Sequence, residues 1–307
     1  MIRKVLIACA STALSLALSG ASCARDMAGV ETVPADAQPA DVQPGPALWK
    51  LADEDTTIYL FGTVHVLPQG RDWYDTRIER AFTAADELVF EIEVEDTAGM
   101  QQVITDKARL AGERSLRELM TPEDRAQFET VLDGFGLAPE TFDRMEPWMA
   151  AMTLSVLPLT KAGYSTESGV EMALTGRATD KTRSALETIE QQIAVFDTLP
   201  MDAQLAYLDH TVEAVPKTSD DVGRMVAEWL EGDADTLAAM MNEEMDDPEL
   251  YRRLLTDRNA RWAGWIGQRM DLPGTVFVAV GAGHLAGTGS VQDLLKERGF
   301  EVTRVWR

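Results

Sequence analysis

The sequence predicts an α/β protein in which a single mixed sheet is built from both chain ends, with a large helical insertion between its halves. Two apolar, β-branched runs at 57–61 and 275–280 have the character of buried strands and belong to opposite ends of the sequence. From about 98 to 270, apolar residues recur mainly at helical spacing. No second linker or repeat divides this region, so 47–307 is expected to form one domain.

Residues 1–24 are expected to be a signal peptide and not part of the fold. A basic start is followed by an apolar run at 5–18 and by small residues up to Ala24. This pattern is typical of export, and the run is too short for a stable transmembrane helix. Cys23 fits a lipoprotein signal except that the usual Leu three residues upstream is missing, so lipidation and simple cleavage after Ala24 stay open as alternatives. We expect a periplasmic protein that meets the membrane only through such a lipid anchor.

Composition narrows the chemistry and the partners of the domain. Residues 25–46 are rich in Pro, Ala and Asp and are expected to form a disordered tether. The cysteines, Cys9 and Cys23, precede the domain, which excludes disulfides, thiolate metal ligands and cysteine nucleophiles from it. The net charge of −23 argues against nucleic acid and anionic membrane surfaces as partners. The oligomeric state is not indicated.

The start of the domain predicts a hairpin, a helix and a further strand. Short strands at 47–51 and 57–61 flank an acidic turn, and 75–87 carries its apolar residues on one helical face. Acids alternate along the next strand, 88–94, so two carboxylates are expected on one face of it.

The remaining elements are mostly helical until the last strands. Thr121 and Pro122 mark a helix start, because Thr is a good N-cap and Pro fits the first turn. The acidic run at 243–247 is most simply a solvated helix end. Further helices are expected at 148–159, 169–177, 188–199, 202–214, 220–231, 234–244, 249–270 and 290–298, and strands at 183–186, 275–280 and 301–305.

Two of the three histidines occupy the same pattern, Gly-x-x-His, directly after a predicted strand. The copies are Gly62 to His65 and Gly281 to His284. With 22 glycines in 307 residues, a His meets Gly three positions earlier about one time in fourteen by chance, so a matched pair is informative. A strand, a glycine turn and an imidazole together present a reactive side chain at the carboxyl edge of an α/β sheet. We expect the fold to bring the two imidazoles together.

Flanking segments extend this pattern in a fixed order. They are 47–49, 58–68, 88–91, 185–188, 190–192, 258–259 and 277–287. Together they resemble the TraB/PrgY/GumN family, which includes the animal TIKI proteins, from about Ala47 to the C-terminus. The resemblance implies a fold related to erythromycin-esterase/ChaN-like proteins and metal-dependent hydrolysis of a peptide or protein substrate. The metal site that it implies consists of His65, His284 and Glu91.

Such a set of ligands has a definite chemistry. Two imidazoles and a carboxylate suit Mn²⁺, Co²⁺ or Zn²⁺ and leave a position for a water whose pKa the ion lowers. Gly62, Gly281 and Gly283 are expected to let the backbone turn sharply and approach the ion without a Cβ in the way. Glu91 is expected either as a ligand or as the general base, with Glu93 and Glu187 as spare carboxylates for the other role.

Arg258 is a candidate to hold a substrate carboxylate or a developing oxyanion, because its guanidinium makes paired hydrogen bonds. Structural roles are the alternatives for these residues. Glu91 would then lie on the polar face of an edge strand, and Glu187 would cap the helix that follows it. Arg258 would pair with Glu249 or Asp257 on its own helix.

Two other features are expected to be structural. His210 lies in a helical segment without a glycine turn and is expected to be a partly exposed structural histidine. The segment 281–286 also matches the Gly-x-Gly-x-x-Ala dinucleotide fingerprint, but the sequence offers no second βαβ half to complete a nucleotide site.

The sequence therefore predicts an exported metal-dependent hydrolase that acts on peptides. The alternative is a non-catalytic protein that sequesters a peptide or serves polysaccharide export, in which the Gly-x-x-His turns are structural or ligand-binding remnants. The retention of both histidines and Glu91 favours the enzyme.

Overall fold

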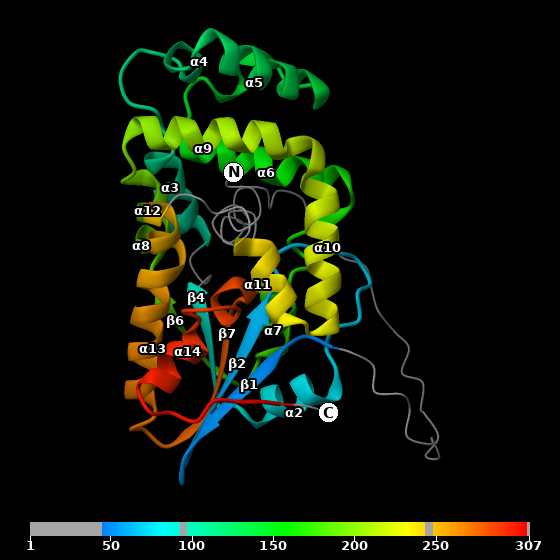
Figure 1. The fold of residues 1–307 in the computed structure, drawn as a ribbon, viewed down its shortest axis with the longest axis vertical. Helices are drawn as coiled ribbons and strands as arrows, with labels where there is room; N and C mark the ends of the chain where they lie inside the picture. Colours follow the sequence, from blue (N-terminus) through cyan, green and yellow to red (C-terminus); the bar gives the residue numbers. More distant parts are fainter. Residues whose placement is uncertain (1–44, 93–96, 243–247, 306–307) are drawn as a thin grey trace.

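A computed structural model describes residues 45–92, 97–242 and 248–305. These residues form an α/β fold around a six-stranded mixed sheet with the strand order β6-β4-β7-β2-β1-β8, as the sequence predicted. Figure 1 shows the sheet in the lower half of the molecule, with helices α6 (Pro147–Lys161) and α9 (Met201–Ala214) running across the molecule above the sheet. The strands are β1 (Leu48–Ala52), β2 (Thr56–Thr63), β4 (Glu87–Ile92), β6 (Thr182–Glu187), β7 (Gly274–Gly281) and β8 (Thr303–Arg304).

The four strands β6, β4, β7 and β2 run parallel, so their carboxyl ends share one edge of the sheet. β2 pairs with β7 from Thr56↔Gly274 to Thr63↔Gly281, which joins the two ends of the chain side by side. β1 forms the predicted antiparallel hairpin with β2, and β8 pairs antiparallel with β1 at the sheet edge. The register places the two Gly-x-x-His turns next to each other at the carboxyl edge.

The two faces of the sheet pack into two separate hydrophobic cores. Along β7, Val276 and Val278 belong to a core with Trp262 and Ile266, while Phe277 belongs to the core of the opposite face. This alternation is expected because successive strand side chains point to opposite faces. The first core is covered by α13 (Asp257–Arg269) and α14 (Val291–Glu297), and the second extends into the helices above the sheet.

Most of the predicted helices are present with ends shifted by a few residues. Thr121 caps α5, with its side chain accepting from the Asp124 amide, as the sequence predicted. The other helices are α2 (Thr76–Ala84), α3 (Thr97–Lys107), α4 (Leu116–Leu119), α5 (Pro122–Gly134), α6 (Pro147–Lys161), α7 (Val170–Arg177), α8 (Ile189–Asp197), α9 (Met201–Ala214), α10 (Thr218–Glu231), α11 (Ala234–Asn242) and α12 (Pro248–Tyr251). Short 3₁₀ turns are η1 (Pro139–Phe142), η2 (Val215–Lys217) and η4 (Ala282–Leu285).

The middle of the chain differs from a purely helical insertion. It contributes β6, which pairs parallel with β4 and forms one edge of the main sheet. It also contributes β5 (Tyr164–Ser165), which pairs with β3 (Leu67–Pro68) just after the first histidine turn. The sheet is therefore built from both chain ends and from one strand of the middle segment.

The long helix predicted at 249–270 is interrupted by a π-helical turn, η3 (Arg252–Thr256), between α12 and α13. Such turns are rare and are frequent at functional sites. Here the turn directly precedes Arg258, on the first turn of α13.

Several expectations fall on residues outside the described ranges: the signal peptide, the lipidation site, most of the tether, Glu93 and the acidic run at 243–247. Within the described ranges, no helix combines the length and the apolar character needed to cross a membrane.

Candidate active site

The carboxyl edge of the four parallel strands collects the predicted site residues. His65 follows β2, His284 follows β7, and Glu91 and Glu187 lie near the ends of β4 and β6. All four side chains are buried: none exceeds 6% exposure. Since the strands are adjacent and parallel, residues that are distant in sequence meet at this edge.

The two imidazoles and Glu91 face one small space. A Cβ built on Gly281 would lie 3.0 Å from Oε1 of Glu91, 3.7 Å from Nε2 of His65 and 3.7 Å from Cδ2 of His284. Because Nε2 of His65 and Cδ2 of His284 both lie 3.7 Å from this Cβ position, the two atoms are at most twice 3.7 Å apart. The expected convergence of the two Gly-x-x-His histidines beside an acid is therefore present in the fold.

His65 is oriented by helix α7. Its Nδ1 lies 2.7 Å from Oε1 of Glu171, and because an ionised carboxylate only accepts, Nδ1 carries the proton and Nε2 the lone pair. The same helix start also holds the backbone of the turn: the amide of Val170 donates to the carbonyl of Val64 at 3.1 Å. A Cβ on Gly169 would lie 2.2 Å from the carbonyl oxygen of His65, so only glycine permits this approach.

The Glu171 contact also sets the charge of the pair. Burial lowers the pKa of His65, but the charge and the hydrogen bond of Glu171 outweigh it and leave the pKa raised. Burial raises the pKa of Glu171, yet His65 holds it below its usual value. The side chain of Glu171 is 19% exposed, so the pair lies near the border of the buried cluster.

His284 has the opposite character. Its Nδ1 lies 2.6 Å from Oδ1 of Asn259, and Asn259 is itself fixed because its amide nitrogen donates to the carbonyl of Gly289 at 2.9 Å. Nδ1 of His284 therefore carries the proton, and Nε2 accepts from Nη1 of Arg258 at 3.1 Å. Burial and then the charge of Arg258 lower the pKa of His284 to about 3, so its imidazole is neutral.

Glu91 is an ionised carboxylate at the centre of the cluster. Oε1 accepts from the Gly281 amide at 2.7 Å, and Oε2 accepts from Gln192 at 2.9 Å and from Nη2 of Arg258 at 2.6 Å. Burial would raise the pKa of Glu91, but Arg258 and the two imidazoles hold it at about 2. The alternative of an edge-strand position is wrong, because β4 lies between β6 and β7.

Arg258 links the acids across the cluster. Its Nε donates to Oε2 of Glu187 at 2.9 Å. The other oxygen of Glu187, Oε1, accepts from Nη2 of Arg261 at 2.9 Å. The guanidinium stacks on Trp262, with 4.7 Å to the ring centroid. The alternative pairing of Arg258 with Glu249 or Asp257 is wrong.

Those two acids on the helix pair instead with Arg252. The alternative capping role of Glu187 is also wrong, because Thr188 is the N-cap of α8 and forms a capping box with Gln191.

The three glycines of the motifs are needed because a Cβ would not fit there, and not because of an unusual backbone conformation. None of them has a positive φ, so the sharp turn that we expected does not depend on left-handed glycine. A Cβ on Gly62 would lie 3.0 Å from Cα of Ala282, where the two turns touch. A Cβ on Gly281 would enter the space between Glu91 and the two imidazoles. A Cβ on Gly283 would collide with the methyl group of Met241 at 2.3 Å.

The two imidazoles and the carboxylate suit a divalent ion as ligands, but a guanidinium lies among them. Neutral imidazole nitrogens and an ionised carboxylate are the ligands that Zn²⁺ and related ions prefer, at about 2.0–2.2 Å. Nε2 of His284 lies 4.0 Å from Oε1 of Glu91, and Arg258 contacts both side chains. As the described side chains stand, no group of three or more His, Cys, Asp or Glu is placed to hold a metal ion. An ion and the guanidinium therefore compete for the same donors.

Other features lie apart from this cluster. His210 is half-buried on α9, as expected of a structural histidine. The segment 281–286 contains the 3₁₀ turn η4, and α14 begins only at Val291. A dinucleotide fingerprint instead places the helix N-terminus at the glycine turn.

Sequence reasoning missed Glu171 as a partner of His65. It lies three residues before the buried Leu174 on a short helix, and nothing in the local pattern distinguishes it from a surface acid. Gln192 and Asn259 belong to segments of the family pattern, but the sequence did not indicate a role for either of them. A buried amide at a helix start beside a predicted site residue is the signal that could have identified them.

The protein is an α/β domain in which two histidines at strand ends lie beside a buried glutamate. Comparisons with known proteins place this domain in a family. The chain belongs to the TraB/PrgY/gumN family, whose model matches residues 47–304. No solved structure matches the chain significantly.

Individual relatives extend over most of the chain. The chain is 28% identical to "Uncharacterized protein YbaP" of Escherichia coli (strain K12) over 245 residues, which cover 78% of this chain and 87% of YbaP. It is 22% identical to an uncharacterized protein of Treponema pallidum over 267 residues, covering 81% of this chain and 80% of that protein. It is 25% identical to "Metalloprotease TIKI1" of Danio rerio over 319 residues, covering 83% of this chain and 62% of TIKI1.

Proposed function

We propose that the protein is a metal-dependent hydrolase that cleaves peptides at the His65–Glu91–His284 cluster. The observation that carries this proposal is the meeting of two oriented imidazoles and an ionised carboxylate at one sheet edge. The name of the relative TIKI1, a metalloprotease, supports hydrolysis of a peptide bond. A fold of the erythromycin-esterase/ChaN-like type and export to the periplasm, with or without a lipid on Cys23, are parts of the same proposal.

The ligands in this proposal are Nε2 of His65, Nε2 of His284 and Oε1 of Glu91. Glu171 and Asn259 hold the Nδ1 proton of each imidazole outward, which leaves both Nε2 lone pairs directed inward. Outer partners of this kind fix the tautomer and the ring orientation of ligating histidines. When bound, a divalent ion such as Mn²⁺, Co²⁺ or Zn²⁺ polarises a scissile carbonyl and makes water a stronger nucleophile.

The remaining groups bind and orient. Glu187 accepts hydrogen bonds from Arg258 and Arg261, so it holds both guanidinium groups at the edge of the cluster. Arg258 occupies the Nε2 lone pair of His284, so this guanidinium must withdraw before an ion can bind there. Once withdrawn, the guanidinium is suited to a developing oxyanion or a substrate carboxylate, because its planar fork offers several donors.

One observation favours the non-catalytic alternative. The guanidinium of Arg258 already pairs with Glu91 and Glu187 and satisfies His284, and Arg261 supplies a second positive charge to Glu187, so each of the two carboxylates has a cationic partner without an ion. In that case the protein would bind a peptide without cleaving it, or serve polysaccharide export, and the histidines would be structural.

The test combines metal content with cleavage. The purified protein is freed of metal with a chelator, loaded in turn with Mn²⁺, Co²⁺ and Zn²⁺, and analysed for bound ion and for cleavage of a peptide mixture. We expect about one ion per chain and cleavage that depends on it, both lost in His65→Ala and in His284→Ala. His210→Ala is the matched control and should retain both. Cleavage that survives both substitutions, or their failure to change ion binding, would reject the proposal.

A further inference from the structure

A small apolar cavity lies directly beside His65. Its volume is about 40 Å³, and its walls include His65, Val64 and Gly283 together with Val226 of α10 and Met241 of α11. Both Gly-x-x-His turns therefore contribute to the wall of this cavity. We propose that it receives an apolar side chain of the substrate, of about the size of Val or Leu, next to the bond that is cleaved. This inference rests on the proposed function, and it adds the substrate class.

The lining of the cavity decides which side chains can enter. Its remaining walls are apolar (Val66, Val222, Met225, Leu237 and Ala282), apart from Thr63. A charged substrate side chain would lose its hydration there, which is strongly unfavourable, and the one ionisable wall residue, His65, is already paired with Glu171 through Nδ1. An apolar side chain instead gains about 25 cal/mol for each Å² removed from water.

The volume sets the size of the side chain. One water needs about 10–15 Å³ when the space is measured in this way, so about 40 Å³ holds roughly three non-hydrogen atoms. A valine side chain has that many carbons. Leucine exceeds it slightly, and the methionines can accommodate the difference because their thioethers are flexible.

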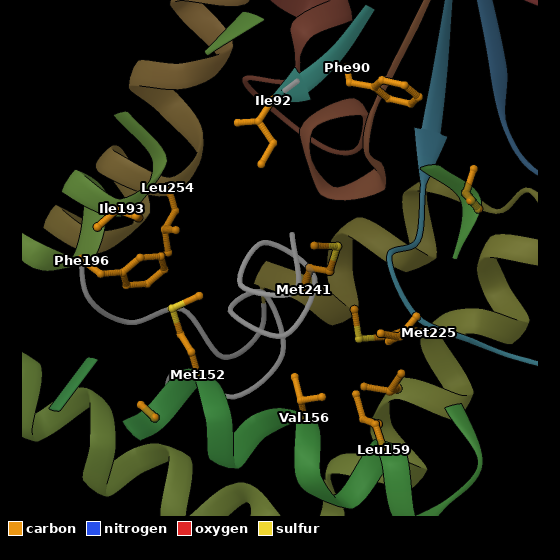
Figure 2. Packing of buried hydrophobic residues seen from close by; sticks show 14 of the residues in the cluster. Phe90, Ile92, Met152, Val156, Leu159, Ile193, Phe196, Met225, Met241 and Leu254 are labelled. Carbon is orange, nitrogen blue, oxygen red and sulfur yellow. The ribbon is translucent and has the colours of Figure 1, made fainter. Parts of the chain in front are cut away.

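Met241 is the adjustable part of the wall. Its Sδ lies 3.2 Å from the position of a Cβ on Gly283, so the absence of a side chain at Gly283 makes room for the thioether. Figure 2 shows Met225 and Met241 turned towards a common interior, with Val156 and Leu159 of α6 beyond them. A shift of either thioether would lengthen the cavity in that direction.

Access to the cavity is at the turns. Val64, Ala282 and Gly283 are partly exposed, whereas the helical walls are buried. A side chain that enters between the turns passes His65, so its backbone would lie against the cluster.

A second cavity shows why the His65 side is the selective one. It lies beside Arg258 and Gln192, with Met152, Phe196 and Leu254 among its walls, but it measures only about 10 Å³. That is about the space of one water. Its size excludes a Val or Leu side chain without movement of the walls.

The first experiment profiles cleavage of a peptide mixture by mass spectrometry. We expect one position beside the cleaved bond to prefer Val, Leu, Ile and Met over Asp, Glu and Lys by about tenfold or more in rate. Val226→Phe fills the cavity and should shift the preference to Gly and Ala. Met241→Ala enlarges it and should admit Phe. Met172→Ala is the matched control, because Met172 is 49% exposed and is not one of the wall residues. Cleavage without side-chain preference at that position, or a preference that neither cavity variant shifts, would overturn the inference.

A second measurement does not depend on cleavage. The protein is labelled with ¹³C at its methionine methyl groups and titrated with N-acetyl-leucine amide and with N-acetyl-aspartate amide. We expect the leucine probe alone to shift the signals of Met225 and Met241, and the signal of Met172 to stay in place. If neither probe or both probes shift them, the cavity is not an apolar subsite. A protein that binds the leucine probe but cleaves no peptide would contradict the proposed function and leave the subsite supported.

Discussion

Glu171 holds His65 through a hydrogen bond of 2.7 Å between its Oε1 and Nδ1 of the imidazole. The contact joins the start of α7 to the turn after β2, and it is reinforced by the close approach of Gly169 to the carbonyl of His65. Glu171 is thus a positioning residue for the proposed ligand.

This relationship predicts the effect of Glu171→Gln. The amide can still accept from Nδ1, but it removes the charge that raises the pKa of His65 and strengthens the imidazole as a ligand. We expect divalent-ion affinity to fall about 10–100-fold with little change in fold, measured by titration calorimetry. The pKa of His65, followed by NMR, should fall in parallel. The matched control is Glu167→Gln, an exposed acid just before the same helix. An equal loss of affinity in both variants would show that Glu171 has no special role.

Arg258→Met tests the charge balance of the cluster. It removes the common partner of Glu91 and Glu187 and leaves the carboxylate of Glu91 buried without its guanidinium. Removal of one partner from a buried ion pair costs about 3–5 kcal/mol, which urea unfolding of the metal-free protein would measure. Arg252→Met, which breaks an exposed pair with Glu249, should cost about 0–1 kcal/mol. Similar losses in the two variants would contradict the assigned role of Arg258.

The glycines of the second motif provide a matched pair of substitutions. Gly281→Ala places a methyl group 3.0 Å from Oε1 of Glu91. Three hydrogen-bond donors hold this carboxylate in place, so it cannot move aside easily. We expect a loss of activity of about 100-fold, since small displacements of reacting groups are costly. Gly283→Ala meets only the end of the flexible Met241 side chain and should retain most activity. The opposite order would place the reacting groups elsewhere.

The pKa values predict how stability depends on pH. The pKa of His284 is lowered to about 3 in the native state from 6.5, so below pH 6.5 the unfolded state binds an additional proton. Stability of the metal-free protein is then fully present above that pH and falls by up to about 1.4 kcal/mol per pH unit as the pH drops towards 3. Glu91, with a pKa lowered to about 2, adds a further loss below its ordinary value of 4.5.

His65 acts in the opposite direction and in another range. Because its pKa is raised, its contribution is present below pH 6.5 and is lost as the pH rises through its native pKa. Urea unfolding at a series of pH values would separate the two. His284→Gln should flatten the slope between pH 4 and 6, whereas His210→Ala should keep it. An unchanged slope in His284→Gln would mean that His284 is not buried in its neutral form.

The sequence predicted the meeting of the two histidines because of a regularity in parallel sheets. β2 and β7 are adjacent and parallel, with Thr63 opposite Gly281, so turns that follow the strands are neighbours. Glu91 was predicted from the family resemblance, and the pairing of β4 with the other side of β7 brings it to the same edge. A residue at the end of a strand can be located from the sequence because the strand itself can be predicted.

Residues that come from helices were not predicted in their roles. Glu171 belongs to a short helix whose position depends on the packing of the middle segment. Arg258, which contacts His284, lies two residues after a π-helical turn that the apolar spacing of 249–270 does not reveal. These contacts follow from tertiary packing rather than from local pattern.

The most direct test of the central claim is a crystal structure of the protein soaked with Mn²⁺ or Zn²⁺, with anomalous scattering recorded for the ion. We predict one strong peak at about 2.0–2.2 Å from Nε2 of His65, Nε2 of His284 and the carboxylate of Glu91, with the Arg258 guanidinium withdrawn from His284. A structure without a peak among these three side chains, with Arg258 still on Nε2 of His284 at saturating ion, would contradict the account.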